Sequence, residues 1–226
     1  MQRTPIQGLL TGAPPPSLAS RLNNLLIESG LDPLDEATAA HFAQYCALLL
    51  HWNARTNLTA IRDEDGILSR HFVESIACAR ALPAGIATLL DFGSGAGFPG
   101  IPIALCRPEM ALTLAESQGK KAAFLQEVVR TLGLAVKVHS GRAELLKERF
   151  DCVTLRAVER MASAVETSFG LLSEKGLLAL MTTEPELAKI QSAMRLDVTW
   201  QRPIILPGSN SRILALGRRD AKLQET

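Results

Sequence analysis

Hydrophobic residues between positions 17 and 84 recur at the spacing of amphipathic helices. The pattern predicts three helices, over residues 17–29, about 36–52 and about 64–81. Ser17 and Asp35 can cap the first two helices, and Pro83 stops the third. Residues 1–16 hold Gly, Pro and Thr without periodicity, and we expect them to form a disordered lead.

The pattern changes near residue 86, where short apolar runs begin to alternate with helical stretches. The predicted strands cover residues 87–91, 111–116, 135–139, 152–155 and 177–181. Helices are predicted between them, for example over residues 120–132 and 161–172. Such βαβ alternation is typical of a doubly wound, mostly parallel sheet with helices on both faces.

Two further strands are predicted over residues 198–205 and 212–216, joined by Pro207-Gly208-Ser209-Asn210. A turn of this composition indicates a hairpin, and therefore an antiparallel pair at the sheet edge. We expect residues 17–84 to form a helical appendage, 85–220 a nucleotide-binding domain and 221–226 a tail.

Composition limits the class of protein but does not identify the protein. The chain has 226 residues, 47% of them hydrophobic, which is ample for one core. A formal net charge of +1 favours no particular partner. No signal segment or membrane span is evident and no Cys or His spacing suggests a metal site, so we expect a cytoplasmic protein without a metal.

The most informative segment follows the first predicted strand, where Asp91 precedes glycines at positions 93, 95, 97 and 100. Glycine lets the backbone approach a bound nucleotide closely. The spacing Gly95-x-Gly97-x-x-Gly100 fits a dinucleotide fingerprint, whereas Asp91-x-Gly93-x-Gly95-x-Gly97 fits an adenosyl-methionine loop. The preceding helical residues and the terminal hairpin favour a methyltransferase over a nicotinamide-dependent dehydrogenase.

Side chains at the carboxyl ends of the strands are the next candidates, because ligands of doubly wound sheets bind there. Glu116 ends the second strand, 19 residues after Gly97, where a carboxylate can accept hydrogen bonds from ribose hydroxyls. Residues 140–144 can contact an adenine ring or simply cap a helix. Arg156 ends the fourth strand and could anchor a cofactor carboxylate or a substrate phosphate, or form a structural ion pair.

The fourth strand lacks the sequence motifs used to methylate exocyclic amines and ring carbons. No Asn/Asp-Pro-Pro-Tyr/Phe sequence follows it, and no Pro-Cys dipeptide is present, so Cys152 is a core residue rather than a nucleophile. An acceptor with its own nucleophilic lone pair, such as guanine N7, needs neither of these motifs.

Polar residues without helical periodicity crowd the appendage and its junction with the α/β part, and such residues are often functional. The candidates for RNA binding are Arg55, Asn57, Arg62, Arg70 and His71. For His71, an interdomain hydrogen bond is the main alternative.

Together these landmarks resemble the RsmG (glucose-inhibited division protein B) family of bacterial methyltransferases. Three blocks carry the resemblance. They are residues 51–63 with 70–75, residues 91–103 with 116–121, and residues 141–144 with 156–157. The first block is not a general methyltransferase feature, so the resemblance is specific.

The resemblance implies a class I methyltransferase fold, Rossmann-like, with an antiparallel edge strand and the N-terminal appendage. It also implies transfer of a methyl group from S-adenosyl-L-methionine to guanine N7 in the decoding-region loop of 16S ribosomal RNA. The partner would be that RNA or the small ribosomal subunit. We expect the protein to be a monomer. By the match, the cofactor-binding residues would be Gly93, Gly95, Gly97, Phe98, Glu116, Ser117, Ala143, Glu144 and Arg156.

Within that set, Gly93 and Phe98 would line the methionine end, Glu116 and Ser117 the ribose, and Arg156 the reacting end as the catalytic candidate. Ala143 and Glu144 would contact the adenine.

Two departures from the family pattern stand out. Residues 181–184 read Met-Thr-Thr-Glu where Lys-Gly is common, and Glu74 stands where Asp is usual, at a position that we expect to cap a helix. A nicotinamide-dependent oxidoreductase and a non-catalytic RNA-binding or ribosome assembly factor remain the alternatives.

Overall fold

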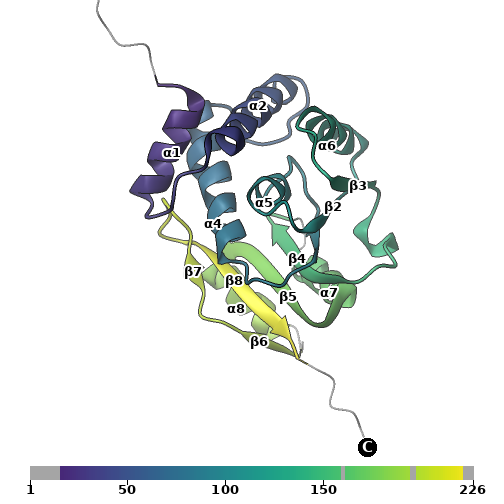
Figure 1. Cartoon of the computed structure of the whole chain (residues 1–226). Helices are drawn as coiled ribbons and strands as arrows, with labels where there is room; N and C mark the ends of the chain where they lie inside the picture. Colours follow the sequence, from purple (N-terminus) through teal and green to yellow (C-terminus); the bar gives the residue numbers. More distant parts are fainter. Residues whose placement is uncertain (1–15, 159–160, 194–196, 221–226) are drawn as a thin grey trace, which may run out of the picture.

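A computed structural model describes residues 16–158, 161–193 and 197–220, so the expected lead up to residue 15 and the tail lie outside the described residues. Eight strands form one sheet (Figure 1). They are β1 (Thr88–Phe92), β2 (Ala111–Glu116), β3 (Val136–Ser140), β4 (Phe150–Arg156), β5 (Leu172–Thr183), β6 (Val198–Trp200), β7 (Ile204–Ile205) and β8 (Arg212–Arg219).

The strands follow the order β3-β2-β1-β4-β5-β8-β6, with β7 paired to β8. Strands β1 to β5 are parallel, and β8 runs antiparallel between β5 and β6. This arrangement confirms the predicted doubly wound, mostly parallel sheet with an antiparallel pair at one edge. The order reverses between β1 and β4, which makes their carboxyl ends the expected ligand crevice.

The helices match the predicted ranges closely. They are α1 (Leu18–Glu28), α2 (Glu36–Asn53), α3 (Glu64–Gly66), η1 (Ile67–Val73), α4 (Glu74–Ala81), α5 (Gly100–Cys106), α6 (Gly119–Thr131), η2 (Ala143–Leu145), α7 (Met161–Leu171) and α8 (Glu184–Ala193). Ser17 and Asp35 cap α1 and α2 by accepting hydrogen bonds from the backbone N–H groups of Ser20 and Thr38.

Two predicted elements differ in detail. The helix expected over 64–81 contains a π-helical stretch, η1, a feature often found at functional sites. The strand expected over 198–205 is broken into β6 and β7, both paired to β8. Pro203 lies in the break, where its missing N–H removes a donor from the ladder.

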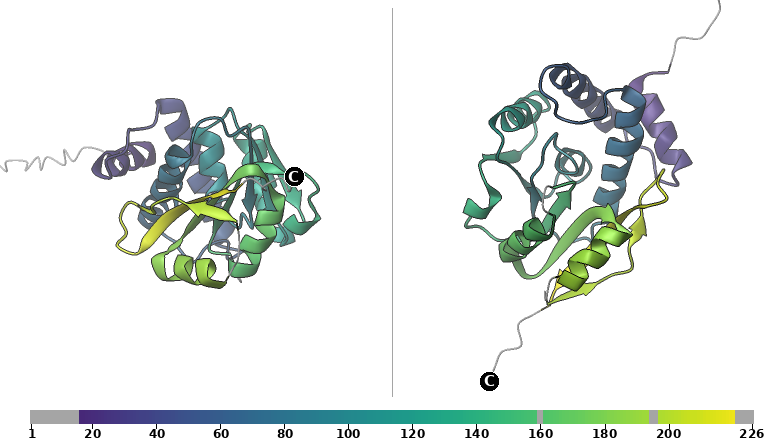
Figure 2. Two further views of the ribbon diagram at one scale, coloured as in Figure 1. Left: turned by 90° about the horizontal axis from the view of Figure 1, so that it is seen from below. Right: turned by 180° about the vertical axis from the view of Figure 1, so that it is seen from behind.

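Helices cover both faces of the sheet (Figures 1 and 2). Helices α7 and α8 pack on one face, around residues such as Val153 and Leu180. On the other face, α1, α2, α4, α5 and α6 share one continuous core with the sheet, in which Phe42, Phe72 and Leu89 are fully buried. The N-terminal helices therefore contribute to the same core as the sheet. Across the described residues, no helix combines the length and the apolar character needed to cross a membrane.

Candidate functional site

The segment between β1 and α5, residues 93–100, is here called the glycine loop, and Asp91 holds it in place. The Asp91 side chain is 1% exposed and accepts hydrogen bonds from the Thr154 hydroxyl (2.8 Å) and the Gly100 N–H (3.2 Å). Burial raises the pKa of this carboxyl to about 6, and these hydrogen bonds oppose the rise. Asp91 is therefore a structural anchor for the loop.

The glycines of the loop serve two different purposes. Gly93, Gly95 and Gly97 have φ values of +68°, +59° and +94°, which disfavour other residues. A Cβ on Gly97 would lie 2.7 Å from the Tyr45 hydroxyl, and one on Gly100 would lie 2.3 Å from Leu114. Positive φ angles at the first three glycines shape the turn, and the missing Cβ atoms of Gly97 and Gly100 permit close packing.

Aromatic side chains from the N-terminal helices pack against the glycine loop. The Tyr45 hydroxyl donates a 2.5 Å hydrogen bond to the carbonyl oxygen of Ala96. Phe98 stacks on the His71 ring at 4.4 Å between centroids, and it also packs against Tyr45 and Phe72. The expected methionine-end residue Phe98 is thus fixed by three aromatic neighbours and is 6% exposed.

Glu116 lies at the end of β2 and faces the glycine loop. Its carboxylate accepts hydrogen bonds from the N–H groups of Gly95 (2.9 Å) and Gln118 (2.7 Å), and the residue is 6% exposed. The structure therefore brings Glu116 and the loop together, as the ribose hypothesis requires. Each carboxylate oxygen can accept more than one hydrogen bond, so acceptor capacity for hydroxyl groups remains.

The other proposed nucleoside contacts lie at the neighbouring strand ends. Ser117 follows Glu116 and is exposed. Ala143 and Glu144 form the short helix η2 after β3, Ala143 buried and Glu144 exposed beside Arg142. These positions surround the carboxyl ends of β2 and β3, next to the glycine loop.

Arg156, at the end of β4, is part of a buried ion-pair network. Its guanidinium group donates to the Glu74 carboxylate (2.9 Å), the Arg70 carbonyl oxygen (2.6 Å) and the Ser75 hydroxyl (3.2 Å). It also lies 5.9 Å from the centre of the Phe98 ring. Burial lowers the pKa of Arg156, while the charge of Glu74 opposes this effect. Arg156 therefore forms the structural ion pair that the sequence left open, and it also lies near Phe98, the residue expected at the methionine end.

Glu74 has a different role from the helix cap expected for it. Helix α4 continues directly from η1, so its start has no free N–H groups that need a cap, and no side-chain cap is present. Instead, Glu74 is 1% exposed and binds two arginines, Arg156 and Arg212, the latter at 2.6 Å.

The RNA-binding candidates occupy varied positions. Arg55 and Arg70 are exposed. Arg62 donates to the Asn57 side chain (2.6 Å) and to the Asn53 carbonyl oxygen (3.2 Å), so it stabilises the loop after α2.

His71 is mostly buried, and its Nε2 lies 2.8 Å from the Thr59 hydroxyl. Burial, with the charges of Arg156 and Arg70, lowers its pKa to about 3, so the ring is neutral at pH 7. Contact between any of these residues and RNA stays a prediction.

Sequence reasoning missed Tyr45, Glu74 and Arg212 as parts of the site. Each acts through a partner at least 51 positions away along the chain. Nothing in the spacing of residues 36–52 singled out Tyr45, and Glu74 stood out only as a departure from the family pattern.

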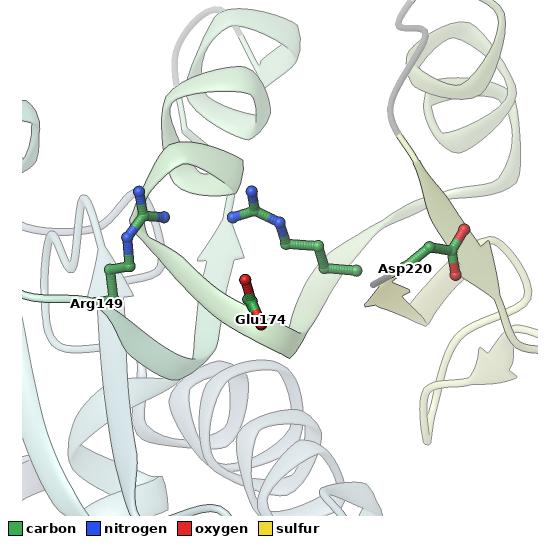
Figure 3. A pocket seen from close by; sticks show the side chains of 4 residues that line it. Arg149, Glu174 and Asp220 are labelled. Carbon is green, nitrogen blue, oxygen red and sulfur yellow. The ribbon is translucent and has the colours of Figure 1, made fainter. Parts of the chain in front are cut away.

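A separate cavity of about 260 Å³ lies at the amino-terminal edge of the sheet (Figure 3), and no residue of the glycine loop lines it. Arg149, Glu174, Arg219 and Asp220 line it. Arg149 and Arg219 both donate to the Leu172 carbonyl oxygen, at 3.0 and 2.9 Å. This cavity faces away from the strand ends at which ligands of such sheets bind.

Within the described ranges, no group of three His, Cys, Asp or Glu side chains could hold a metal ion. Cys152 is fully buried in β4, and burial raises the pKa of its thiol well above the usual value. It is therefore a core residue, as expected.

The residues at the crevice fit S-adenosyl-L-methionine. The space above Gly95 is open, since a Cβ there would meet only the Gly93 carbonyl oxygen, at 3.9 Å. The Glu116 carboxylate, the expected acceptor for ribose hydroxyls, lies beside this space through its hydrogen bond to the Gly95 N–H. An open backbone turn beside a carboxylate acceptor fits the nucleoside part of this cofactor.

Comparisons with known proteins agree with this geometry. The family model "GidB: rRNA small subunit methyltransferase G" matches residues 38–202. The chain is 40% identical to the ribosomal RNA small subunit methyltransferase G of Roseiflexus sp. (strain RS-1), over 81% of this chain and 84% of the relative. It is also 40% identical to the protein of that name from Stenotrophomonas maltophilia (strain K279a), over 86% and 91%.

A solved SAM-dependent O-methyltransferase from Thermotoga maritima shares the fold, with a TM-score of 0.53 at 13% identity over 78% of this chain and 73% of that chain. The match of the family model over most of the chain and the identity to curated relatives place the sequence among methyltransferases, and the nicotinamide-dependent alternative is not favoured. The chain belongs to the rRNA small subunit methyltransferase G (GidB) family.

Proposed function

We propose that this protein transfers a methyl group from S-adenosyl-L-methionine to N7 of one guanine in the decoding-region loop of 16S ribosomal RNA. The observation that carries the proposal is the pairing of Glu116 with the Gly95 N–H at the crevice, in a chain of this family. We further propose that the enzyme works as a cytoplasmic monomer on the RNA or on the small ribosomal subunit.

Different residues of the crevice would bind different parts of the cofactor. Glu116 and Ser117 would bind the ribose, and η2 with Ala143 and Glu144 would contact the adenine. Gly93 and Phe98 would line the methionine end, with Gly95 and Gly97 as the backbone between them. When bound, the cofactor supplies a methyl group on a positively charged sulfonium.

The chemistry requires alignment more than proton transfer. Guanine N7 carries a lone pair and no proton, so its in-line attack on the methyl carbon needs no general base and no covalent intermediate. Holding two reactants in line can contribute several kcal/mol to the lowering of the barrier. Arg156, clamped by Glu74 and lying against Phe98, is the proposed catalytic contact at the reacting end.

The target guanine must leave any paired helix before it reacts. N7 faces the deep, narrow major groove of paired RNA, which side chains do not enter. A base in a loop, or one splayed out of its stack, can reach the crevice. Arg55, exposed in the turn after α2, and Arg70, exposed on η1, would then contact the RNA around the site.

The direct test is transfer of labelled methyl from S-adenosyl-L-methionine to bacterial 16S RNA and to intact small subunits. Mass spectrometry of the nucleosides should find 7-methylguanosine at a single site. Absence of transfer to both substrates, with cofactor binding intact by calorimetry, would instead favour a non-catalytic RNA-binding or assembly factor.

A further inference from the structure

Arg212, the first residue of β8, has a position and a charge environment that the cofactor site leaves unexplained. Its Cα pairs with that of Thr183 at the end of β5, so the side chain begins at the same edge of the sheet as the crevice. Its Nε donates a 2.6 Å hydrogen bond to Glu74 Oε1. The Arg212 side chain is 27% exposed, whereas Glu74 is almost completely buried.

The two terminal nitrogens of Arg212 have no acceptor among the described residues, since its only side-chain bond there is the one through Nε. A guanidinium group carries five N–H donors in a planar fork that matches a phosphate. Buried Glu74 binds the Nε side of this fork and leaves the terminal N–H donors to other acceptors. The bond to Glu74 restrains the guanidinium group before any ligand arrives.

The balance of charge around Glu74 favours an anion. One carboxylate here faces two guanidinium groups, those of Arg156 and Arg212. Burial lowers the pKa of Arg156, and the positive charges of Arg212 and Arg70 lower it further. The network therefore carries excess positive charge, which a phosphate group would neutralise.

The strand order separates Arg212 from the nucleoside part of the crevice. Strand β8 is three places from β1 and four from β2. At about 4.8 Å per strand, Arg212 starts roughly 14 Å from the glycine loop and roughly 19 Å from Glu116. The cofactor's nucleoside would occupy the ends of β1, β2 and β3, so the β5–β8 side remains for the methyl acceptor.

We infer that Arg212 binds a backbone phosphate of the RNA substrate and that Glu74 is the positioning residue which aims it. The inference rests on the proposed function in taking RNA as the acceptor. It assigns a substrate contact to β8, which is the last of the described strands in sequence. In the sheet, β8 lies on the opposite side of Arg156 from the proposed cofactor site.

The test compares Arg212→Gln with Arg218→Gln, a matched control on the same strand. Arg218 is exposed at the opposite end of β8, where it donates to the Lys175 carbonyl oxygen. We expect R212Q to raise KM for 16S RNA about tenfold, the loss of one charge-assisted contact, with kcat and the cofactor Kd unchanged. R218Q should leave all three unchanged.

Filter binding of labelled 16S RNA between 50 and 200 mM KCl, on the order of physiological salt, adds a readout that a purely structural role would not move. The slope of log K against log salt should fall by about 0.7 in R212Q, as expected for one lost phosphate contact on a single strand. Equal slopes in R212Q and R218Q would overturn the inference. A higher Kd for the cofactor in R212Q would also overturn it.

Glu74 is tested by the pair E74Q and E74D. E74Q should raise KM for RNA, and E74D should restore it because both carboxylate oxygens remain. If E74Q does not fold, the arginine pair still decides the question. A wild-type protein that binds RNA but transfers no methyl group would refute the proposed function, while the salt slope of R212Q would still test the phosphate contact.

Discussion

The Tyr45 hydroxyl on α2 and the Ala96 carbonyl oxygen in the glycine loop are joined by a buried hydrogen bond across 51 positions of sequence. The bond links the N-terminal helices to the segment that would hold the cofactor. Since Gly97 also leaves room for the same hydroxyl, the loop and α2 fit each other at two consecutive residues.

Tyr45→Phe should therefore affect both folding and cofactor binding. The substitution leaves the Ala96 carbonyl oxygen buried without its donor, which costs about 1–3 kcal/mol. We expect a lower free energy of unfolding in urea and a weaker affinity for S-adenosyl-L-methionine by calorimetry. Trp52→Phe, which removes the bond to Glu127 away from the loop, should lower stability alone. Equal cofactor affinities in Y45F and wild type would contradict the linkage.

Glu116→Gln tests the ribose contact with little change of shape. The amide keeps one acceptor oxygen but loses the negative charge, and charge-assisted hydrogen bonds contribute roughly 1.5–3 kcal/mol. The cofactor Kd should rise by about tenfold or more, measured by calorimetry. Glu109→Gln, at an exposed carboxylate paired with Arg107, serves as control and should bind the cofactor as wild type does. An unchanged Kd in E116Q would exclude the ribose role.

Gly100→Ala and Gly119→Ala form a matched pair at the starts of α5 and α6. A Cβ on Gly100 would lie 2.3 Å from Leu114 Cδ2 and 2.7 Å from Asp91 Oδ2, whereas nothing lies within 4 Å of one on Gly119. Overpacking of this kind costs about 1–3 kcal/mol, and alanine in open helical space is neutral or stabilising. Thermal unfolding should give a lower Tm for G100A only. Similar Tm values would show that the loop can shift away.

His71 should make the protein less stable in mild acid. The pKa of its ring falls from 6.5 to about 3 on folding, chiefly through burial. The unfolded chain therefore takes up a proton as pH drops below about 6.5, whereas the folded protein does so only near pH 3, and stability is lost across this window.

His71→Gln should remove that part of the pH dependence, as urea unfolding between pH 7 and 4 can measure. Asp91 contributes in the opposite direction, because its pKa rises from 3.8 to about 6 on folding and its stabilising effect is lost as pH rises through that range. This contribution is common to both proteins and cancels in the comparison. Parallel curves for H71Q and wild type would refute the assignment.

Much of the fold could be predicted because each element carries its own local pattern. Strand β2 begins and ends where the alternation of apolar runs placed it, and Ser17 and Asp35 cap their helices as expected. The π-helical stretch η1 has no comparable signal, because one extra residue per turn barely alters an apolar pattern over seven residues.

The contacts within the site are harder to predict from sequence. Arg212 and Glu74 lie 138 positions apart, and nothing near either residue points to the other. Their meeting depends on β8 lying next to β5, which is a property of the whole sheet. Local patterns therefore located the crevice and its nucleoside side, whereas the ion-pair network on the other side required the folded chain.

The place of β8 in the sheet also bears on how the protein is made. Of the described strands, β8 is synthesised last, yet it lies between β5 and β6 and pairs with both. A nascent chain that ends before residue 212 leaves one edge of β5 unpaired along an apolar strand, which is a template for aggregation. Because Arg212 arrives with β8, translation must pass this strand before Glu74 has both of its partners.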